Sequence, residues 1–588
     1  MRIGVKMGVE TMKRTVQVFV KEQLLLLAMV LLPALTPDIL LAQNVADQSP
    51  RLLKQDGRFA MMVDGKPFLM LGSQINNSSS WAGTLSEVWP ALEAMHVNTV
   101  EAPVYWEQME PAPGTFDFSS VDLLVKGARE HKLHLVILWF GTWKNGQAHY
   151  VPEWVKSDPV KYPREVSAQG KVLDVMSPNS AVNMEADKRA FAALMRHVHA
   201  IDATEHTVIL MQVENESGSV GAVRDYSAAA NKEFAGAVPA ALLSALHGSD
   251  AATGGARGGA KGGTWTQVFG ADADERFAAY STAKYINEVT LAGKREHAIP
   301  MYCNVWITYP VHALENRDHA SPGQEYPSGG AQQGNIAIWK AAAPAIDILA
   351  PDFYSGDAAL FREVLATYRR DDNALFVPET GLSKTVGRYF FYALGSGAIG
   401  FSPFGVDYTN WTIADEKIPF GMAENFALFR PMAEAVARLN FEGKMQTAVE
   451  EKGAERQVLR FAGSSDKGET TGDVEAVVSF GFPQHDGEMP PGSTDVQGRA
   501  MVAQLGPYDF LVTGFGASVS FRLAAPAGGK AQEKQIEILR ADEGQYVDGT
   551  WQTARILNGD QTDRGLNFKE HNTAVVQIHL HTLPLYGR

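Results

Sequence analysis

Two glutamates stand directly after apolar runs, where their carboxyl groups could do acid–base chemistry. Glu216 belongs to "QVENESG" (212–218), and Glu379 belongs to "VPETG" (377–381). A pair of carboxyl groups can cleave a glycosidic bond, because one protonates the leaving oxygen while the other attacks the anomeric carbon or activates water. Alternatively, each glutamate is a structural residue held in an ion pair, for example with an arginine.

The residues next to Glu216 raise a question of side-chain direction. In a regular strand side chains alternate between faces, so Glu214 and Glu216 would point one way and Asn215 the other. A bend of the strand into a loop would break this alternation.

Polar and aromatic residues also lie near the ends of the other apolar runs, and they are Gln74, Glu101, Trp143, Asn145, Asn304, Trp306, Asp352, Tyr354 and Phe404. Amides and aromatic rings suit an uncharged ligand such as a sugar. Histidine and cysteine do not cluster among them, which argues against a metal site. We expect neither a metal nor a cofactor.

The elements that must position these residues follow a regular alternation. From about residue 67, eight short apolar runs are separated by amphipathic stretches, and the runs span 67–74, 97–104, 133–140, 206–215, 299–306, 346–354, 373–380 and 398–405. Such runs are typical of buried parallel strands. Eight strand–helix repeats favour an α/β fold of the (β/α)₈ barrel type. Catalytic residues of such barrels lie at the C-terminal strand ends, so Glu216 and Glu379 would lie at the tips of the fourth and seventh strands. For this pair we favour catalysis.

The helices between the runs have readable starts and faces. "TLSE" places Thr84 and Glu87 at capping-box spacing, which predicts a helix start. Stretches 187–200 and 357–370 carry apolar residues at helical spacing.

The pattern changes after about residue 440. Residues 517–524 and 575–582 alternate apolar and polar side chains, as in half-buried antiparallel strands. We therefore predict a catalytic barrel over residues 50–435 and an antiparallel β-sandwich-like domain over residues 440–588.

Charge and the N-terminus bear on partners and location. The formal net charge is −15 and no basic tract is present, so we expect no nucleic-acid partner. Basic residues precede the apolar stretch 24–35, and a small-residue pattern ends at Ala42. We predict a signal peptide over residues 1–42 and an exported protein, periplasmic or secreted. The stretch is short for a bilayer span, so we expect no stable membrane insertion.

Two stretches resemble motifs of glycoside hydrolase family 35. "QVENESG" resembles the family's acid/base motif, Gln-x-Glu-Asn-Glu-Tyr/Phe-Gly, and "VNTVEAPVYWEQMEPAPGTFDFS" (97–119) resembles its Asn-Thr-Val…Trp…Glu-Pro-x-Pro-Gly-x-x-x-Phe stretch. The likeness spans roughly residues 60–410. The resemblance implies Glu216 as acid/base and Glu379 as nucleophile. It also implies that Asn215 binds the sugar 2-hydroxyl and that Glu214 is structural, facing the barrel wall.

The chain departs from the family pattern near the expected sugar. Ser217 replaces an aromatic residue, and Pro103 stands where typical members have a sugar-contacting tyrosine. In the third-strand loop "GTWKNG" (141–146), Asn145 stands near the usual acid. We expect Asn145 to bind the axial 4-hydroxyl of galactose and Trp143 to form a stacking wall, unless both only pack the loop. Further substrate contacts are expected from Trp306, Tyr354 and Glu101.

The resemblance implies a retaining, exo-acting β-galactosidase of a divergent bacterial branch. Its expected substrates are terminal β-galactosyl units of plant-type oligosaccharides or polysaccharides, with xyloglucan side chains as the sharper hypothesis. Two alternatives stay open. One is another exo-β-glycosidase, of arabinopyranosidase or fucosidase type, and the other is a catalytically silent sugar-binding protein on the same scaffold.

Overall fold

The computed structural model describes residues 48–247, 262–308, 321–407, 420–452, 456–463, 465–466, 469–470, 473–480, 497–525 and 534–585. The predicted signal peptide, residues 1–42, lies outside the described residues. Within the described ranges, every helix is too short or too polar to cross a membrane.

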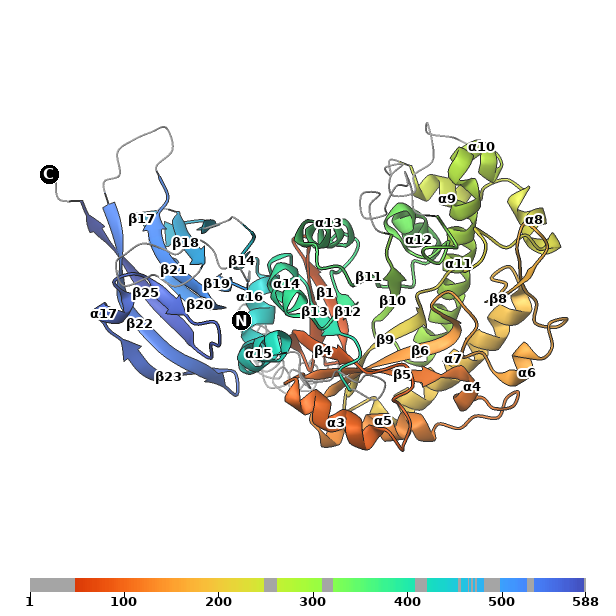
Figure 1. Ribbon diagram of the computed structural model, residues 1–588, viewed down its shortest axis with the longest axis horizontal. Coiled ribbons are helices and arrows are strands. Elements are labelled where there is room, and N and C mark those ends of the chain that lie inside the picture. Colours follow the sequence, from red (N-terminus) through yellow and green to blue (C-terminus); the bar gives the residue numbers. More distant parts are fainter. Residues whose placement is uncertain are drawn as a thin grey trace, which may run out of the picture. The chain divides into compact units, whose positions relative to one another are not determined.

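A closed barrel of eight parallel strands forms the first part of the fold (Figure 1). Its strands, in barrel order, are β4 (Met70–Gln74), β5 (Thr99–Tyr105), β6 (His134–Lys144), β9 (Val208–Asn215), β10 (Met301–Trp306), β11 (Ile348–Phe353), β12 (Val377–Thr380) and β13 (Gly400–Pro403), and β13 pairs with β4 to close the ring. Each corresponds to one of the eight predicted apolar runs. The predicted (β/α)₈ barrel is therefore confirmed.

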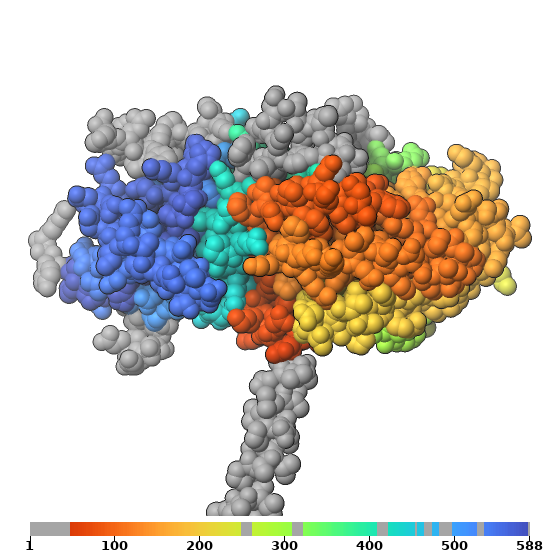
Figure 2. Space-filling view, turned by 90° about the horizontal axis from the view of Figure 1, so that it is seen from below, coloured from red at the N-terminus to blue at the C-terminus, as the bar shows by residue number. Residues whose placement is uncertain are grey.

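Helices cover the outside of the barrel. The longer ones are α3 (Leu85–Ala94), α5 (Ser119–Glu130), α7 (Ala181–Asp202), α11 (Ala273–Glu296), α13 (Ala358–Tyr368), α14 (Lys384–Gly395), α15 (Phe420–Phe429) and α16 (Ala433–Phe441). Shorter ones are α4 (Trp106–Met109), α6 (Glu153–Lys156), α8 (Ala228–Phe234), α9 (Ala240–Ala245), α10 (Trp265–Phe269) and α12 (Ile336–Ala342). Figure 2 shows the orange residues of α3 and α5 on the outer surface. In α7, Phe191, Leu194 and Val198 are buried at helical spacing, as predicted.

Helix α3 begins at the predicted residue, but the predicted capping box does not form. The Thr84 hydroxyl accepts no bond from the helix. It donates instead to the carbonyl oxygens of Ser79 and Trp81, at 2.7 and 2.9 Å. The capping-box prediction is therefore wrong, because the preceding turn supplies a competing acceptor.

A three-stranded meander precedes the barrel, made of β1 (Arg51–Gln55), β2 (Arg58–Val63) and β3 (Lys66–Phe68). Both of its turns are Asp-Gly pairs with positive φ at both residues, the conformation of a type I′ hairpin. Met61 and Val63 of β2 share an apolar cluster with the inward-facing Met70, Leu210 and Tyr302. The meander therefore packs against the barrel interior.

Antiparallel sheets follow the barrel, as predicted. One sheet has the order β14 (Met445–Val449), β19 (Arg499–Gln504), β20 (Asp509–Phe515), β25 (Val575–Pro584), β22 (Lys534–Val547) and β23 (Thr550–Leu557). The other has the order β15 (Arg456–Phe461), β18 (Val474–Phe480), β21 (Ala517–Leu523) and β24 (Leu566–Phe568). Both contribute to one apolar cluster, for example through Phe510, Val478 and Val519. Two short hairpins complete the strands, β7 (Arg164–Val166) with β8 (Val172–Met176), and β16 (Ser465–Asp466) with β17 (Glu469–Thr470).

Candidate active site

The end of β9 breaks the alternation of a regular strand. Glu214 and Glu216 have φ values of 64° and 44°, in the left-handed region that most side chains avoid. Glu214 consequently turns away from the barrel axis, and its Oε2 accepts a 2.7 Å hydrogen bond from the backbone N–H of Trp143. Because of the bend, the consecutive residues Asn215 and Glu216 both lie at the same end of the barrel.

Glu214 is buried beside Asp187 of α7, which belongs to a hydrogen-bond network with β6. Asp187 of α7 accepts bonds from Trp139 Nε1 at 2.9 Å and from Thr142 Oγ1 at 2.7 Å. Burial, followed by the charge of Asp187, raises the pKa of Glu214 well above its usual range. Burial and the charge of Asp187 thus favour the neutral form of Glu214, and its bond to the Trp143 backbone gives it a structural place rather than a catalytic one.

Three carboxyl groups meet at the tips of β9, β11 and β12. Glu216, Asp352 and Glu379 each offer an oxygen within 4.8 Å of the others. Glu379 Oε1 accepts a 2.5 Å hydrogen bond from the Tyr354 hydroxyl. Burial and the adjacent Glu379 raise the pKa of Tyr354, so this phenol remains a donor at neutral pH.

The surroundings of Glu216 suit a proton donor. Burial, followed by the negative charge of Glu379, raises the pKa of Glu216 to about 7. The charge of Lys144 opposes this rise. Lys144 is the last residue of β6, pairs in register with Asn215, and is only 4% exposed. Glu216 can thus hold a proton near neutral pH, as a general acid must.

Asn304 at β10 ties Glu216 to Asp352. Its Oδ1 accepts from the backbone N–H of Glu216 at 2.9 Å, and its Nδ2 donates to Asp352 Oδ2 at 2.7 Å. Sequence reasoning placed Asn304 and Asp352 at strand ends without a role and gave Lys144 no part. The available signal was a charged residue closing an apolar run, as in "ILAPD" and "LWFGTWK".

Two expected substrate contacts do not have the predicted surroundings. Trp143 is 1% exposed and packs edge-on against Tyr285 of α11, at 4.9 Å between ring centroids. A sugar cannot stack on this ring, so the structure contradicts the stacking wall. Glu101 is fully buried within β5, where it accepts from the Tyr302 hydroxyl at 3.2 Å. Burial raises the pKa of Glu101 to about 8, and its place is the barrel interior.

Asn145 has a local structural explanation. Lys144 and Gln147 exchange backbone hydrogen bonds of 2.9 and 3.1 Å around an Asn145–Gly146 turn. Both turn residues have positive φ, at 54° and 68°, which favours Asn-Gly. The turn accounts for the residue type, and the predicted contact with galactose stays a prediction.

The other expected contacts lie near the acids. Asn215 is buried, and its side-chain atoms form no hydrogen bond with any described residue. Trp306 pairs in register with Asp352, and Tyr354 is 47% exposed while bonding Glu379.

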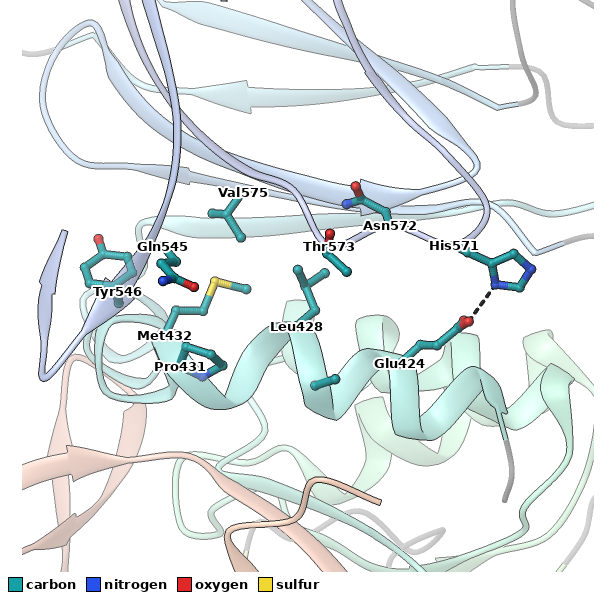
Figure 3. Close-up of a pocket in the computed structure, with 11 residues that line it drawn as sticks. Glu424, Leu428, Pro431, Met432, Gln545, Tyr546, His571, Asn572, Thr573 and Val575 are labelled. Carbon is teal, nitrogen blue, oxygen red and sulfur yellow. Dashed lines mark hydrogen bonds and ion pairs between the residues drawn. The ribbon is translucent and has the colours of Figure 1, made fainter. Parts of the chain in front are cut away.

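A separate pocket of about 280 Å³ is lined by residues between positions 424 and 575 (Figure 3). Its lining includes Leu428 of α15, Met432 in the turn after that helix, Tyr546 of β22 and residues of the segment before β25. Glu424 and His571 form a 2.6 Å ion pair at its side. None of the three clustered carboxyl groups contributes to this pocket.

Two family models match parts of the chain. Residues 60–304 match the model of Glycosyl hydrolases family 35, and residues 422–569 match a domain of unknown function, DUF5597. No curated protein is significantly similar in sequence.

Similar solved structures include β-galactosidases from three bacteria. That of Bacillus circulans sp. alkalophilus has 14% identity and a TM-score of 0.43, with 63% of this chain and 57% of that chain covered. That of Marinomonas ef1 has 11% identity and a TM-score of 0.44, with coverage of 65% and 62%. That of Rahnella sp. R3 has 15% identity and a TM-score of 0.44, with coverage of 66% and 59%. The chain thus spans less than two thirds of the length of each.

The family match covers β4, β5, β6, β9 and the first four residues of β10, and includes both stretches that resembled the family. The resemblance is confirmed: residues 60–304, which form the first part of the barrel, match the model of glycosyl hydrolases family 35.

Proposed function

We propose that the chain is a retaining, exo-acting β-galactosidase. The observation that carries the proposal is the approach of Glu216 and Glu379 to within 4.8 Å at the tips of the fourth and seventh barrel strands. Retaining glycosidases separate their carboxyl groups by about 5–5.5 Å, whereas inverting enzymes need roughly 6.5–9.5 Å for an intervening water.

The reaction uses the two glutamates in two steps. Glu379 attacks the anomeric carbon while Glu216 gives its proton to the leaving glycosidic oxygen, which yields a covalent glycosyl-enzyme. Glu216, now a carboxylate, then takes a proton from water as that water displaces Glu379. Tyr354 donates to Glu379 and thereby orients the attacking carboxylate.

Proton NMR of early product tests this assignment. Net retention gives the β-anomer first, and an initial α-anomer would refute the pairing of roles. A catalytically silent scaffold would release no nitrophenol from a nitrophenyl β-galactoside at any pH.

We propose terminal β-galactosyl units of plant-type oligosaccharides as substrate, with xyloglucan side chains as the sharper hypothesis. Galactose differs from glucose in its axial 4-hydroxyl, and a site built to bind that group rejects the epimer. Asn145→Gly removes the candidate side chain but keeps the positive φ of the turn, which alanine would strain. The wild type should prefer the galactoside over the glucoside, and the variant should lose this preference. Better cleavage of an arabinopyranoside or fucoside would favour the alternative exo-glycosidase.

Export is also proposed, on the N-terminal pattern alone. Expression in a bacterial host should give a mature protein in the periplasm or medium that begins near residue 43. Retention of residues 1–42 on a cytoplasmic protein would contradict this proposal.

A further inference from the structure

Asp352 is a third carboxyl group that neither step of the proposed reaction uses. It lies at the tip of β11, is 3% exposed, and pairs in register with Glu379. A buried carboxylate without a compensating partner is strongly disfavoured. Its position within 4.8 Å of both glutamates therefore calls for a role.

The orientation of Asp352 is set by Asn304. Because Asn304 Nδ2 donates to Oδ2, that oxygen of Asp352 is an acceptor. The other oxygen, Oδ1, receives no hydrogen bond from a donor group among the described residues. Oxygens of Asp352 and Glu216 approach within 4.8 Å, and a hydrogen bond between two carboxyl groups needs a proton on one of them. Oδ1 is thus free to carry the proton of that bond.

The surrounding charges favour a neutral Asp352. The titratable groups that act on the Asp352–Glu216 pair from neighbouring elements are Glu379, Lys144, Tyr302, Tyr354 and Tyr368. Lys144 offers one positive charge, and the nucleophile Glu379 supplies one negative charge when ionised. A second carboxylate at Asp352 would be an unbalanced buried charge, and burial with Glu379 raises the pKa of Asp352 well above its usual range.

We propose that Asp352 is a positioning residue that stays protonated and donates a hydrogen bond to Glu216. The bond stabilises the Glu216 carboxylate formed when its proton passes to the leaving group, and it persists while that carboxylate takes a proton from water. Asp352 keeps its own proton throughout. The inference rests on the proposed function, because it assigns Asp352 to that acid/base.

Two substitutions at Asp352 separate this role from a structural one. Asp352→Asn keeps both bonds, since the amide oxygen can accept from Asn304 and the amide nitrogen can donate to Glu216. The alkaline limb of the kcat/KM profile should therefore stay within a few tenths of a pH unit of wild type. Asp352→Ala removes the donor and should move that limb up by about one pH unit, the size of one hydrogen bond to a charged group. Glu101→Gln, which removes another buried carboxyl group, is the control and should not reproduce the alanine shift.

Two kinetic outcomes would overturn the proposal. If Asp352 were ionised, both substitutions would shift the alkaline limb of the kcat/KM profile to lower pH, because each would remove a negative charge beside Glu216. An unmoved limb in Asp352→Ala would show that Asp352 does not act on Glu216.

Infrared spectroscopy gives a reading that needs no activity. In protein labelled with ¹³C at the aspartate carboxyl groups, the wild type at pH 8 should show a protonated-carboxyl band that Asp352→Asn lacks. Absence of that difference overturns the proposal. If no glycoside is hydrolysed, the proposed function fails, while the infrared result still decides the state of Asp352.

Discussion

Replacing Glu216 by glutamine should stabilise the fold at alkaline pH but not at acidic pH. The pKa of Glu216 is raised from 4.5 to about 7 in the folded chain, so the native state binds this proton more tightly than the unfolded state. Proton binding at Glu216 therefore contributes to the free energy of unfolding. This contribution is fully present below pH 4.5 and is lost as the pH rises to 7. At 1.36 kcal/mol per pH unit, the loss amounts to about 3 kcal/mol. Glutamine carries no charge and escapes this loss.

Thermal unfolding at pH 4.5 and pH 8 measures the effect. With an unfolding entropy of roughly 2.1 cal/mol/K per residue, about 3 kcal/mol raises the unfolding temperature of a chain this long by roughly 3 °C. We expect that gain for Glu216→Gln at pH 8 and its disappearance at pH 4.5. Glu130→Gln changes a glutamate whose side chain is 61% exposed and serves as the matched control. An equal gain at both pH values, or none, would refute the reasoning.

The remaining predictions concern the reaction and the strand ends. Glu216→Ala should spare nitrophenyl glycosides and cripple substrates with poor leaving groups, because proton donation matters most for the latter; equal losses of kcat/KM would contradict the role. Glu379→Gly should be rescued by azide with formation of the α-glycosyl azide, which NMR identifies. Tyr354→Phe removes a 2.5 Å bond to a charged group and should lower kcat/KM by roughly 10- to 100-fold, with glycoside kinetics as the measurement. Gly141→Ala would place a Cβ 2.2 Å from Trp139 Nε1 and should lower the unfolding temperature in a denaturation scan.

The barrel could be predicted because its strands are buried on both faces. Continuous apolar runs then mark each strand, and the eight runs coincide with the eight barrel strands. Counting the same runs also placed Glu216 and Glu379 at the tips of the fourth and seventh strands, β9 and β12. The meander before the barrel could also have been predicted, since "QDGR" and "VDGK" are hairpin signals between short apolar segments.

The surroundings of the site were harder to predict because they depend on tertiary packing. Trp143 was expected to face the sugar, but the bend in β9 and the approach of α11 turn its ring into the helix layer. The burial of Lys144 depends on the register of β6 with β9, which no local pattern specifies. Asn145 had a local signal, the Asn-Gly pair of a type I′ turn, that competes with the galactose interpretation.

The bend at the end of β9 links the stability of the fold to its proposed chemistry. Non-glycine residues in sparsely populated backbone regions cost of the order of 1–3 kcal/mol each, and Glu214 and Glu216 are both such residues. Their bonds to the Trp143 N–H and the Asn304 side chain oppose this strain. Because Asn304 also holds Asp352, the contact that maintains the bend is the one that places a third carboxyl group beside Glu216. The strained conformation thus brings Asn215 and Glu216 to one end of the barrel, an arrangement that a regular strand cannot provide.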